Sequence, residues 1–338
     1  MPYLHEKGFE CTFAPLVNEK DDNVLYAEEH YFSKFIITIK SFFKRLSDVR
    51  AASKFDIIFI QREAYLLGTA YFEKQFKRSG AKVVFDFDDA IWLTNVSDVN
   101  KKFGWLKRPT KTAEIISISD LIISGNSYLA DYARTYNPEV IMIPTSVDTD
   151  KFQRKHEPET KERICIGWTG SHTTIKHFSL AIPFLIELKK KYGDRIYFKV
   201  IGDPAYYNAE LGIQGLKWNN DTEIEDLSEI DIGIMPLPND AWSRGKCGLK
   251  SLEYMALRIP PVISPVGVNS EIVKDGIDGF IADSNAEWVD KISRLIESPQ
   301  LRKQMGEKAR QTVIERYSVI AHRDTYVEIL NKLVSTPR

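Results

Sequence analysis

Short apolar runs alternate with longer amphipathic stretches along most of this chain. The runs are rich in β-branched and aromatic residues and are typical of buried parallel strands, whereas the stretches between them have the spacing of helices. Strands are predicted at 11–16, 56–61, 81–87, 120–125 and 139–145, and again at 164–170, 196–202, 215–218, 230–237, 260–264 and 278–284. Helices are predicted around 178–192, 249–256, 286–297, 299–317 and 319–333. This alternation predicts an α/β fold with parallel sheets.

The alternation is interrupted once, by a charged segment from Asp148 to Arg163 that is poor in apolar residues. A chain of 338 residues is long enough for two domains. We therefore predict a Rossmann-like N-terminal domain at 1–150, a linker at 151–163 and a Rossmann-like C-terminal domain at 164–317. The helix at 318–338 is expected to pack back on the first domain.

The amino-terminal stretch differs from the start of an ordinary doubly wound domain. Residues 2–10 are typical of the end of a helix, with Gly8 as its C-terminal cap, and they lead directly into the run at 11–16. The strand and glycine-bearing turn that usually open such a domain are missing from this pattern. We expect either that the chain is short at its amino terminus or that the domain is built differently.

Composition and charge exclude several classes of protein. Hydrophobic residues make up 43% and charged residues 28%, which is ordinary for a globular chain. Lys plus Arg number 46 and Asp plus Glu 47, so the net charge of -1 gives no field that favours nucleic acid. The basic stretches at 101–111 and 189–195 fit either solvated helix faces or a peripheral contact with an anionic membrane.

The three cysteines, Cys11, Cys165 and Cys247, form no paired motif and have no neighbouring histidines in metal-ligand spacing. The amino terminus lacks the basic segment and apolar core of a signal peptide. We therefore expect a cytoplasmic protein without a disulfide framework or a zinc cluster.

The richest segment for chemistry is 242–264, where glycines and lysines precede a helix. Gly245 and Gly248 allow the backbone to approach a ligand, and the free N–H groups at the helix start favour a phosphate. Lys246 and Lys250 add positive charge, and Glu253 lies one turn inside the helix, where a carboxylate commonly accepts hydrogen bonds from ribose hydroxyls. A nucleotide site is one interpretation. An ordinary core helix after a glycine-containing loop is the other.

A second candidate lies at 166–177, where a strand gives way to a turn of small residues. Gly170 and Ser171 are placed to hold phosphate oxygens, and Lys176 is close enough in sequence to reach the same anion. His172 and His177 lie far from any other histidine or cysteine that would complete a metal site, so we expect them to be bystanders.

A third candidate is the acidic cluster of Asp86, Asp88 and Asp89, which follows the predicted strand at 81–87. Ligands bind α/β proteins at this carboxyl edge of the sheet. The acids could bind Mg²⁺, act as a base or position sugar hydroxyls, or they could be solvated loop residues that pair with Arg62.

The acidic cluster also resembles the phosphatase motif of the haloacid dehalogenase superfamily. In that motif the first aspartate is the nucleophile and Mg²⁺ is the cofactor. The sequence that follows here, Asp89-Ala90-Ile91, departs from the small pair that the superfamily expects. A phosphatase would also leave the two glycine-containing loops of the second half unexplained.

Taken together, the two halves resemble a glycosyltransferase of the two-Rossmann GT-B architecture, most similar to the retaining family 4 (glycosyl transferases group 1). Three motifs carry the resemblance: LEYMALRIPPVIS at 252–264, IPTSVDTDKF at 143–152 and DGIDGFIAD at 275–283. The resemblance covers nearly the whole chain and implies two doubly wound α/β domains that face a cleft. It also implies that the first strand and its glycine-rich loop are missing.

The resemblance assigns roles to individual residues. Glu253 matches the family's second motif glutamate, which binds the donor ribose, while Gly245 stands where the family has its first glutamate, which contacts the donor sugar. The other residues implied to hold the donor are Gly170, Ser171, Lys176, Lys246, Gly248, Leu249 and Lys250. Asp88 falls near the position of a residue beside the reacting sugar and is the predicted catalytic residue, with Arg62 and Asp89 on the acceptor side.

The implied reaction moves a sugar from a nucleoside diphosphate sugar to an acceptor hydroxyl. The acceptor would be a glycan or a lipid-linked molecule in cell-surface polysaccharide or glycoconjugate synthesis, and no cofactor or metal would be needed. Two alternatives stay open at this point. A chain that lacks the first strand could bind the nucleotide sugar without turnover, or the acidic cluster could belong to a Mg²⁺-dependent phosphatase.

Overall fold

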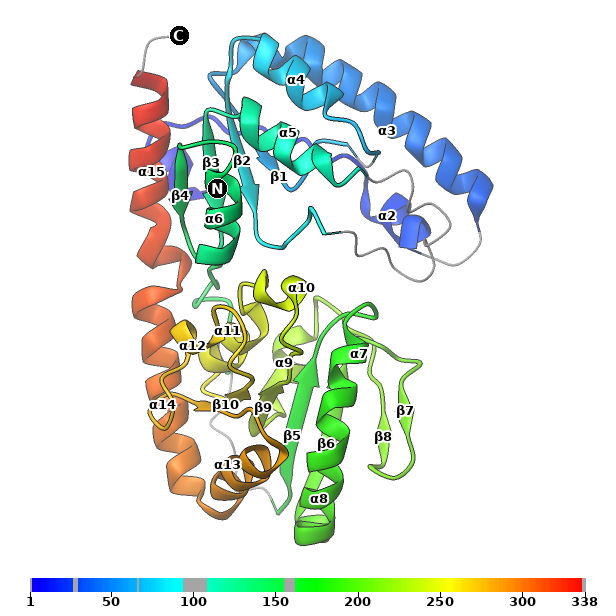
Figure 1. Cartoon of the computed structure of the whole chain (residues 1–338), viewed down its shortest axis with the longest axis vertical. Coiled ribbons are helices and arrows are strands. Elements are labelled where there is room, and N and C mark those ends of the chain that lie inside the picture. The colour runs from blue at the N-terminus through cyan, green and yellow to red at the C-terminus, as the bar shows by residue number, and fades with distance from the viewer. Residues whose placement is uncertain (1, 27–29, 66, 94–107, 155–161, 336–338) are drawn as a thin grey trace. The chain divides into compact units, whose positions relative to one another are not determined.

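The computed structural model describes residues 2–26, 30–65, 67–93, 108–154 and 162–335 (Figure 1). The chain forms two compact units. Unit 1 contains residues 1–144 and 323–338, and unit 2 contains residues 145–322. Among the described residues, every helix is too short or too polar to cross a bilayer.

Unit 1 is built around a parallel sheet of four strands in the order β1-β2-β3-β4. Its strands are β1 (Ile57–Gln61), β2 (Lys82–Phe87), β3 (Leu121–Ser124) and β4 (Val140–Met142). Its helices are α1 (Pro2–Glu6), α2 (Glu19–Tyr26), α3 (Tyr31–Ala51), α4 (Tyr71–Arg78), α5 (Thr110–Ile118) and α6 (Ser127–Arg134). Strand order follows chain order, without a reversal among the residues described for this unit.

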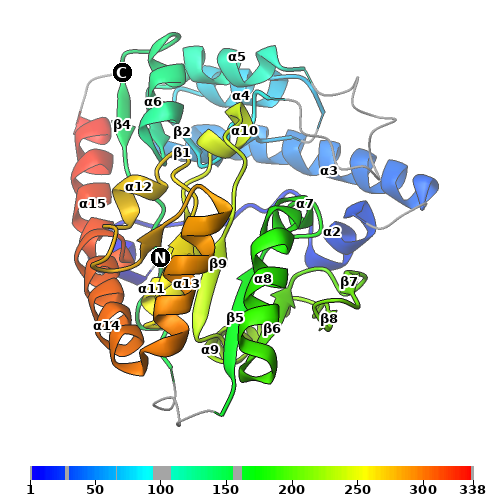
Figure 2. The same cartoon turned by 60° about the horizontal axis from the view of Figure 1, so that its bottom comes forward.

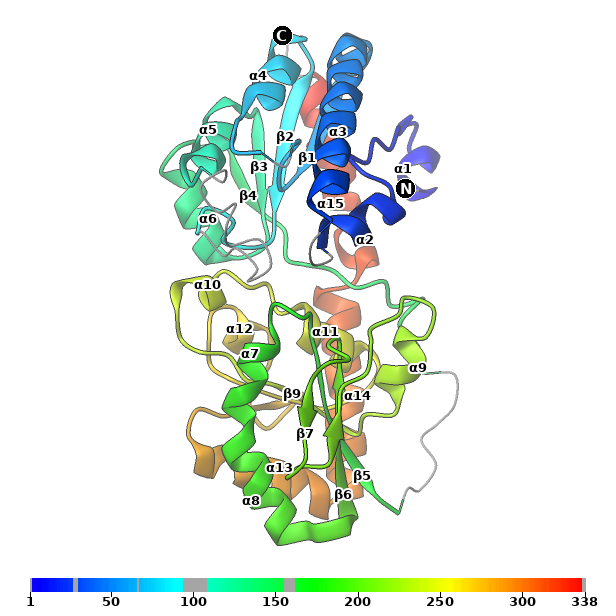
Figure 3. The same cartoon turned by 90° about the vertical axis from the view of Figure 1, so that its right-hand side faces the viewer.

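Helices cover both faces of this sheet. Figure 3 shows α4, α5 and α6 on one side, and α3 with the C-terminal part of α15 (Val319–Ser335) on the other. On the α15 side, four buried side chains of the sheet pack against three partly buried ones of the helix: Val84, Leu121, Ile123 and Ile143 against Tyr326, Ile329 and Leu333. The last helix thus completes the core of the first unit.

The predicted start of the chain is partly wrong. The helix end is present, because α1 stops at Glu6 and Gly8 takes the left-handed φ of 85° typical of a C-terminal cap. The predicted strand at 11–16, however, is irregular and mostly exposed, and Phe13 keeps 83% of its surface in solvent. Among the described residues this run pairs with no neighbouring strand, so it forms no hydrogen-bonded ladder.

Unit 2 contains a second parallel sheet of five strands and a short antiparallel hairpin. The strands are β5 (Ile164–Thr169), β6 (Ile196–Ile201), β9 (Ile232–Met235), β10 (Pro261–Ile263) and β11 (Phe280–Ile281), with β7 (Tyr207–Asn208) and β8 (Ile213–Gln214) in the hairpin. The helices are α7 (Ile175–Phe178), α8 (Ile182–Tyr192), α9 (Glu223–Ser228), α10 (Ala241–Arg244), α11 (Leu249–Ala256), α12 (Asn269–Ile272), α13 (Asn285–Glu297), α14 (Pro299–Arg316) and the start of α15. The predicted strand at 215–218 is reduced to a single bridge between Leu216 and Ile201.

Two apolar cores sandwich the second sheet. Helices α8 and α13 pack side by side over one face, as Figure 2 shows, and Phe184 stacks on Trp288 between them at 4.6 Å. Helices α11 and α14 pack together on the other face, around Leu252, Met255 and Val313. The strand order β11-β10-β9-β5-β6 reverses direction between β5 and β9, which is the arrangement of a doubly wound domain.

The boundary between the units lies at 144/145, which is ahead of the linker predicted for 151–163. Phe152 is buried in the core of unit 2, and the guanidinium of Arg310 donates hydrogen bonds to the carbonyls of Thr149 and Phe152. These contacts tie the first part of the charged segment to unit 2. Residues 155–161 of the predicted linker lie outside the described residues. The chain passes back into unit 1 at residue 323, inside α15.

Candidate functional site

The strand reversal in unit 2 positions the loops that the sequence selected. The turn after β5 carries Gly170 and Ser171 and leads into α7, which carries Lys176, and the loop after β9 leads through Lys246 into α11. Because β5 and β9 are parallel neighbours on the two sides of the reversal, both loops leave the same edge of the sheet. Doubly wound proteins bind ligands at this point.

The turn after β5 is closely packed by backbone. Gly202 at the end of β6 has φ 125°, and a Cβ there would lie 1.9 Å from the carbonyl oxygen of Gly170. A Cβ on Gly170 would itself meet the ring of Trp168 at 2.2 Å. The N–H of Ser171 donates to the hydroxyl of Thr174 at 2.9 Å, which closes the turn ahead of α7. Two glycines are therefore needed where the strand ends and the candidate site begins.

The start of α11 is the next feature at this edge of the sheet. Gly248 precedes the helix with φ 72°, and a Cβ there would lie 2.2 Å from Ile272, so a larger residue would be both strained and crowded. No side chain caps this end of the helix, among the residues described. Leu249 in the first turn is 46% exposed. A free helix start with an exposed apolar side chain suits an anion attached to an apolar or aromatic group.

Three lysines of the two loops converge around one buried histidine. Burial lowers the pKa of His177 to about 4, and the positive charges of Lys246, Lys250 and Lys176 lower it further in that order. The imidazole is neutral at physiological pH, because a proton there would add a fourth positive charge. All three predicted lysines thus lie close enough to His177 to lower its pKa.

Lys250 links the two loops directly. Its Nζ lies 3.4 Å from the hydroxyl of Thr174 in the turn after β5, and 4.7 Å from the centre of the Trp168 ring. The ring face attracts the ammonium and holds it at the end of β5. Sequence reasoning missed Trp168, although a tryptophan at the penultimate position of the strand before a small-residue turn was a usable signal.

Three buried polar atoms near this edge have no hydrogen-bond partner among the described residues. They are Nδ1 of His177, Nε1 of Trp242 and the hydroxyl of Ser243. Trp242 and Ser243 belong to α10, and Asp240 at the start of that helix is close enough to His177 to influence its pKa. Buried polar groups are normally satisfied, so unpartnered atoms beside a lysine cluster fit a site that completes its hydrogen bonds with a polar ligand.

Glu253 is partly buried on α11, beside α9. Burial is the main reason that its pKa is raised to about 8, and the neighbouring Glu223 raises it further, while Lys250 and Lys151 oppose the shift. Glu223 is held by Trp218, whose indole N–H donates to it at 2.8 Å. Near neutral pH the Glu253 carboxyl is mostly protonated, so it can both donate to and accept from a pair of hydroxyls.

Replacement of Glu253 by glutamine should flatten the pH dependence of stability. A folded-state pKa of about 8, against 4.5 in the unfolded chain, means that the stability contributed by the protonated acid is complete below pH 4.5 and is lost as pH rises through 8. Glutamine imitates the protonated form, so we expect Glu253→Gln to exceed the parent by roughly 1–3 kcal/mol at high pH and to match it at low pH. Urea unfolding across pH measures this.

The control for that experiment is Glu210→Gln, which changes an exposed glutamate on the β7–β8 hairpin. It should follow the parent at every pH. Parallel stability curves for the parent and Glu253→Gln would show that Glu253 ionises normally.

Tyr254 fixes α11 against β5. Its ring is fully buried, and its hydroxyl accepts the backbone N–H of Thr169 at 2.8 Å. Gly233 in β9 makes room for the ring, since a Cβ there would lie 2.4 Å from Cδ2 of Tyr254. A glycine inside an apolar strand often marks such a close approach, and this signal could have identified the pair.

Tyr254→Phe should destabilise unit 2 by about 1–3 kcal/mol, because the buried N–H of Thr169 loses its acceptor. Chemical unfolding measures the loss. Tyr207→Phe removes the same hydroxyl oxygen from a side chain that is 67% exposed, and it should leave the stability unchanged. If the two variants are equally stable, the hydrogen bond to the Tyr254 hydroxyl does not stabilise unit 2.

The acidic residues of unit 1 are paired with Arg62. The guanidinium lies 2.9 Å from Asp88 and 2.8 Å from Asp89. Arg62 follows β1 with φ 62°, a left-handed conformation that is unusual for arginine, and its backbone N–H donates to the carbonyl of Asp86. The trio lies at the carboxyl ends of β1 and β2, where the sequence analysis placed it, and all three side chains reach solvent.

Asp86 is the titrating member of this group. Burial raises its pKa to about 7, the charge of Asp88 raises it further, and Arg62 opposes the shift. Its neighbour Tyr326 of α15 also has a raised pKa, mainly through burial. With a pKa of about 7, Asp86 is about half ionised near neutral pH. Within the described residues, histidine, cysteine, aspartate and glutamate form no group of three or more that could hold a metal ion.

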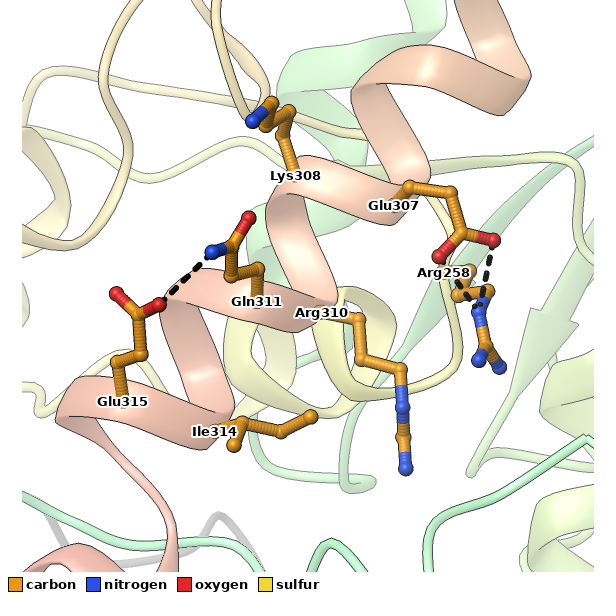
Figure 4. A pocket seen from close by; sticks show the side chains of 7 residues that line it. All are labelled: Arg258, Glu307, Lys308, Arg310, Gln311, Ile314 and Glu315. Atoms are coloured by element: carbon orange, nitrogen blue, oxygen red, sulfur yellow. Dashed lines mark hydrogen bonds and ion pairs between the residues drawn. The ribbon is translucent and has the colours of Figure 1, made fainter.

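A hollow of about 320 Å³ lies elsewhere on unit 2 (Figure 4). It is lined by Arg258, Glu307, Lys308, Arg310, Gln311, Ile314 and Glu315, mostly from α14. None of the residues predicted to bind the donor lines it. Arg258 and Glu307 in its lining form an ion pair, so their charges already compensate each other.

Comparison with known proteins gives the family. Residues 148–312 match the family described as glycosyl transferases group 1. The match covers just under half of the chain. The matched range begins within the segment that is tied to unit 2 and contains both candidate loops. The predicted resemblance is confirmed at this level, while the family 4 subtype and the retaining outcome stay predictions.

Related proteins agree with the family. The chain is 25% identical over 242 residues to an uncharacterized glycosyltransferase of Methanocaldococcus jannaschii, covering 61% of this chain and 65% of that protein. It is 36% identical over 86 residues to a trehalose synthase of Pyrococcus horikoshii, covering 25% of this chain and 21% of the synthase. The chain thus spans less than two thirds of the length of both relatives.

The solved structures establish the fold of this chain. The Anabaena protein HepE, solved in complex with UDP and glucose, superposes with a TM-score of 0.63 at 15% identity, covering 86% of this chain and 81% of HepE. The predicted α/β fold with two Rossmann-like sheets, which is the GT-B fold, is confirmed.

Proposed function

We propose that this protein transfers a sugar from a nucleoside diphosphate sugar to an acceptor hydroxyl. The observation that carries the proposal is the convergence of Lys176, Lys246 and Lys250 at the strand reversal of unit 2, beside the free start of α11. HepE, which shares the fold, was solved with UDP and glucose, and this supports uridine diphosphate as the first nucleotide to test.

The lysines and the helix start would act on the leaving diphosphate. As the bond between sugar and diphosphate breaks, negative charge grows on the phosphate oxygens. Fixed ammonium groups and backbone N–H donors stabilise that charge without needing to reorganise. In this proposal Gly170, Ser171 and Gly248 let the phosphates approach, Leu249 contacts the apolar part of the donor, and Glu253 binds the ribose hydroxyls. No metal takes part.

The acceptor side is proposed to involve unit 1. Asp88 is the proposed catalytic residue, with Arg62 and Asp89 positioning the acceptor. The ion pairs of Arg62 hold both carboxylates in place. Asp86, whose pKa is about 7, is the neighbouring group best suited to take up a proton near neutral pH.

The wider setting is part of the same proposal. We place the reaction in the synthesis of a cell-surface polysaccharide or glycoconjugate in the cytoplasm, with a glycan or lipid-linked acceptor. Its support is the family that residues 148–312 match.

Calorimetric titration with UDP, GDP and ADP and their hexose conjugates, followed by a turnover assay with the donor that binds, tests the proposal. Binding with turnover supports it, and binding without turnover supports the alternative of a nucleotide-sugar-binding protein. If none of these nucleotides binds, the proposed function is wrong. Activity that disappears in EDTA and returns with Mg²⁺ would favour the metal-dependent alternative.

A further inference from the structure

Helix α3 of unit 1 is oriented with its polar side chains inward. Ser41 and Arg45 are buried, and Ile37 is the apolar member of the same stripe. The hydroxyl of Tyr65 donates to the carbonyl of Thr38, and the guanidinium of Arg45 donates to the carbonyl of Ala14 at 3.3 Å and pairs with Asp48 at 3.0 Å. These bonds fix the rotation of the helix about its axis.

The opposite face of α3 is apolar and exposed. Helical spacing places seven large side chains along it: Tyr31, Phe32, Phe35, Ile36, Ile39, Phe42 and Phe43. Phe32, Phe35 and Phe43 keep 76%, 61% and 63% of their surface in solvent, while Phe42 also touches Tyr65 and Phe72. The helix lies at the periphery of unit 1 (Figure 1). A contiguous exposed apolar stripe of this kind marks a surface that contacts a membrane or another protein.

The charges around the stripe select the kind of partner. The helix carries Lys34, Lys40, Lys44, Arg45 and Arg50 against the single acid Asp48. Lys40 is 63% exposed and pairs with Asp21 of α2, and Lys44 is 38% exposed and pairs with Asp48. Both acids are less exposed than their lysine partners, so the ammonium groups are the outermost charges of these two pairs. In a symmetric contact between two copies, this cation-bearing face would meet its own copy.

We infer that α3 is a membrane-contact helix that lies flat on an anionic bilayer, with its phenylalanines in the acyl region and its cations at the lipid phosphates. A long helix with an aromatic apolar face and flanking lysines has the composition of interfacial helices. The polar stripe, which in a free amphipathic helix faces water, here binds the body of unit 1. This inference does not depend on the proposed sugar transfer.

Co-sedimentation of the full chain with vesicles tests the inference. One set is pure phosphatidylcholine, and the other contains about one third phosphatidylglycerol. We expect the parent to bind the anionic set, to bind more weakly as salt rises, and to lose about tenfold or more in partitioning when Phe32, Phe35 and Phe43 are all changed to serine. These positions are exposed, so the variant should keep the fold, which circular dichroism checks.

The control variant changes three exposed apolar residues of unit 2, Leu180, Ile277 and Ile314, to serine and should bind as the parent does. Failure of the parent to bind anionic vesicles, or equal binding by both triple variants, would overturn the inference. So would a lipid-free dimer by light scattering that the α3 variant alone converts to monomer, because a second copy would then cover the stripe.

Discussion

Lys250→Met is expected to weaken the binding of UDP by about 10- to 100-fold. The substitution keeps a flexible side chain over the Trp168 ring but removes the ammonium that links the turn after β5 to the start of α11. A charge-assisted hydrogen bond to phosphate contributes roughly 1.5–3 kcal/mol, which corresponds to that range of affinity. Isothermal titration at low and high salt measures both the loss and its electrostatic origin.

Lys190→Met on the exposed side of α8 is the matched control for Lys250→Met. It changes the net charge by the same amount but lies outside both candidate loops, so UDP binding should stay within twofold of the parent. If both variants bind UDP equally well, the phosphate site is not where the three lysines meet.

Gly202→Ala should cost about 2–5 kcal/mol of stability and abolish donor binding. The new Cβ would combine a backbone conformation that alanine avoids with an approach of 1.9 Å to the carbonyl of Gly170. Neither group is the end of a flexible side chain, so the turn after β5 must move, and Ser171 moves with it. Denaturant unfolding and UDP titration measure the two effects.

Gly276→Ala is the control that separates the effect of backbone strain from that of a steric clash. Gly276 also has a positive φ, 78°, but a Cβ there meets nothing within 4 Å. We expect a loss of about 1 kcal/mol and unchanged UDP binding. Equal effects of the two substitutions would mean that backbone conformation alone, and not the contact with Gly170, matters at residue 202.

The sequence predicts the sheets of this protein well because both are buried on two faces. Continuous apolar runs such as those at 81–87 and 164–170 have few alternatives to a central parallel strand. The segments at 11–16 and 215–218 form no regular strand, since a ladder also requires a neighbouring strand in register. The position of the unit boundary depends on the contacts of Phe152 and Arg310, which no local pattern encodes.

The sequence singles out the lysines and glycines of the candidate site because a phosphate site needs such residues in loops at strand ends. The residues that hold these lysines and loops in place were not predicted. Trp168 contacts Lys250, and Tyr254 of α11 accepts a hydrogen bond from Thr169 of β5. Each contact joins residues more than eighty positions apart in the sequence. The ion pairs of Arg62 were anticipated as one alternative, whereas the raised pKa of Asp86 follows from burial that only the folded chain provides.

The return of the chain into unit 1 at residue 323 sets an order for biosynthesis. Val84, Leu121, Ile123 and Ile143 leave the ribosome long before Tyr326, Ile329 and Leu333, which pack against them. All of unit 2 is translated in between. The first unit to emerge is thus the last to be completed, and its uncovered sheet face is what a nascent-chain chaperone would encounter while the rest of the polypeptide is still being made.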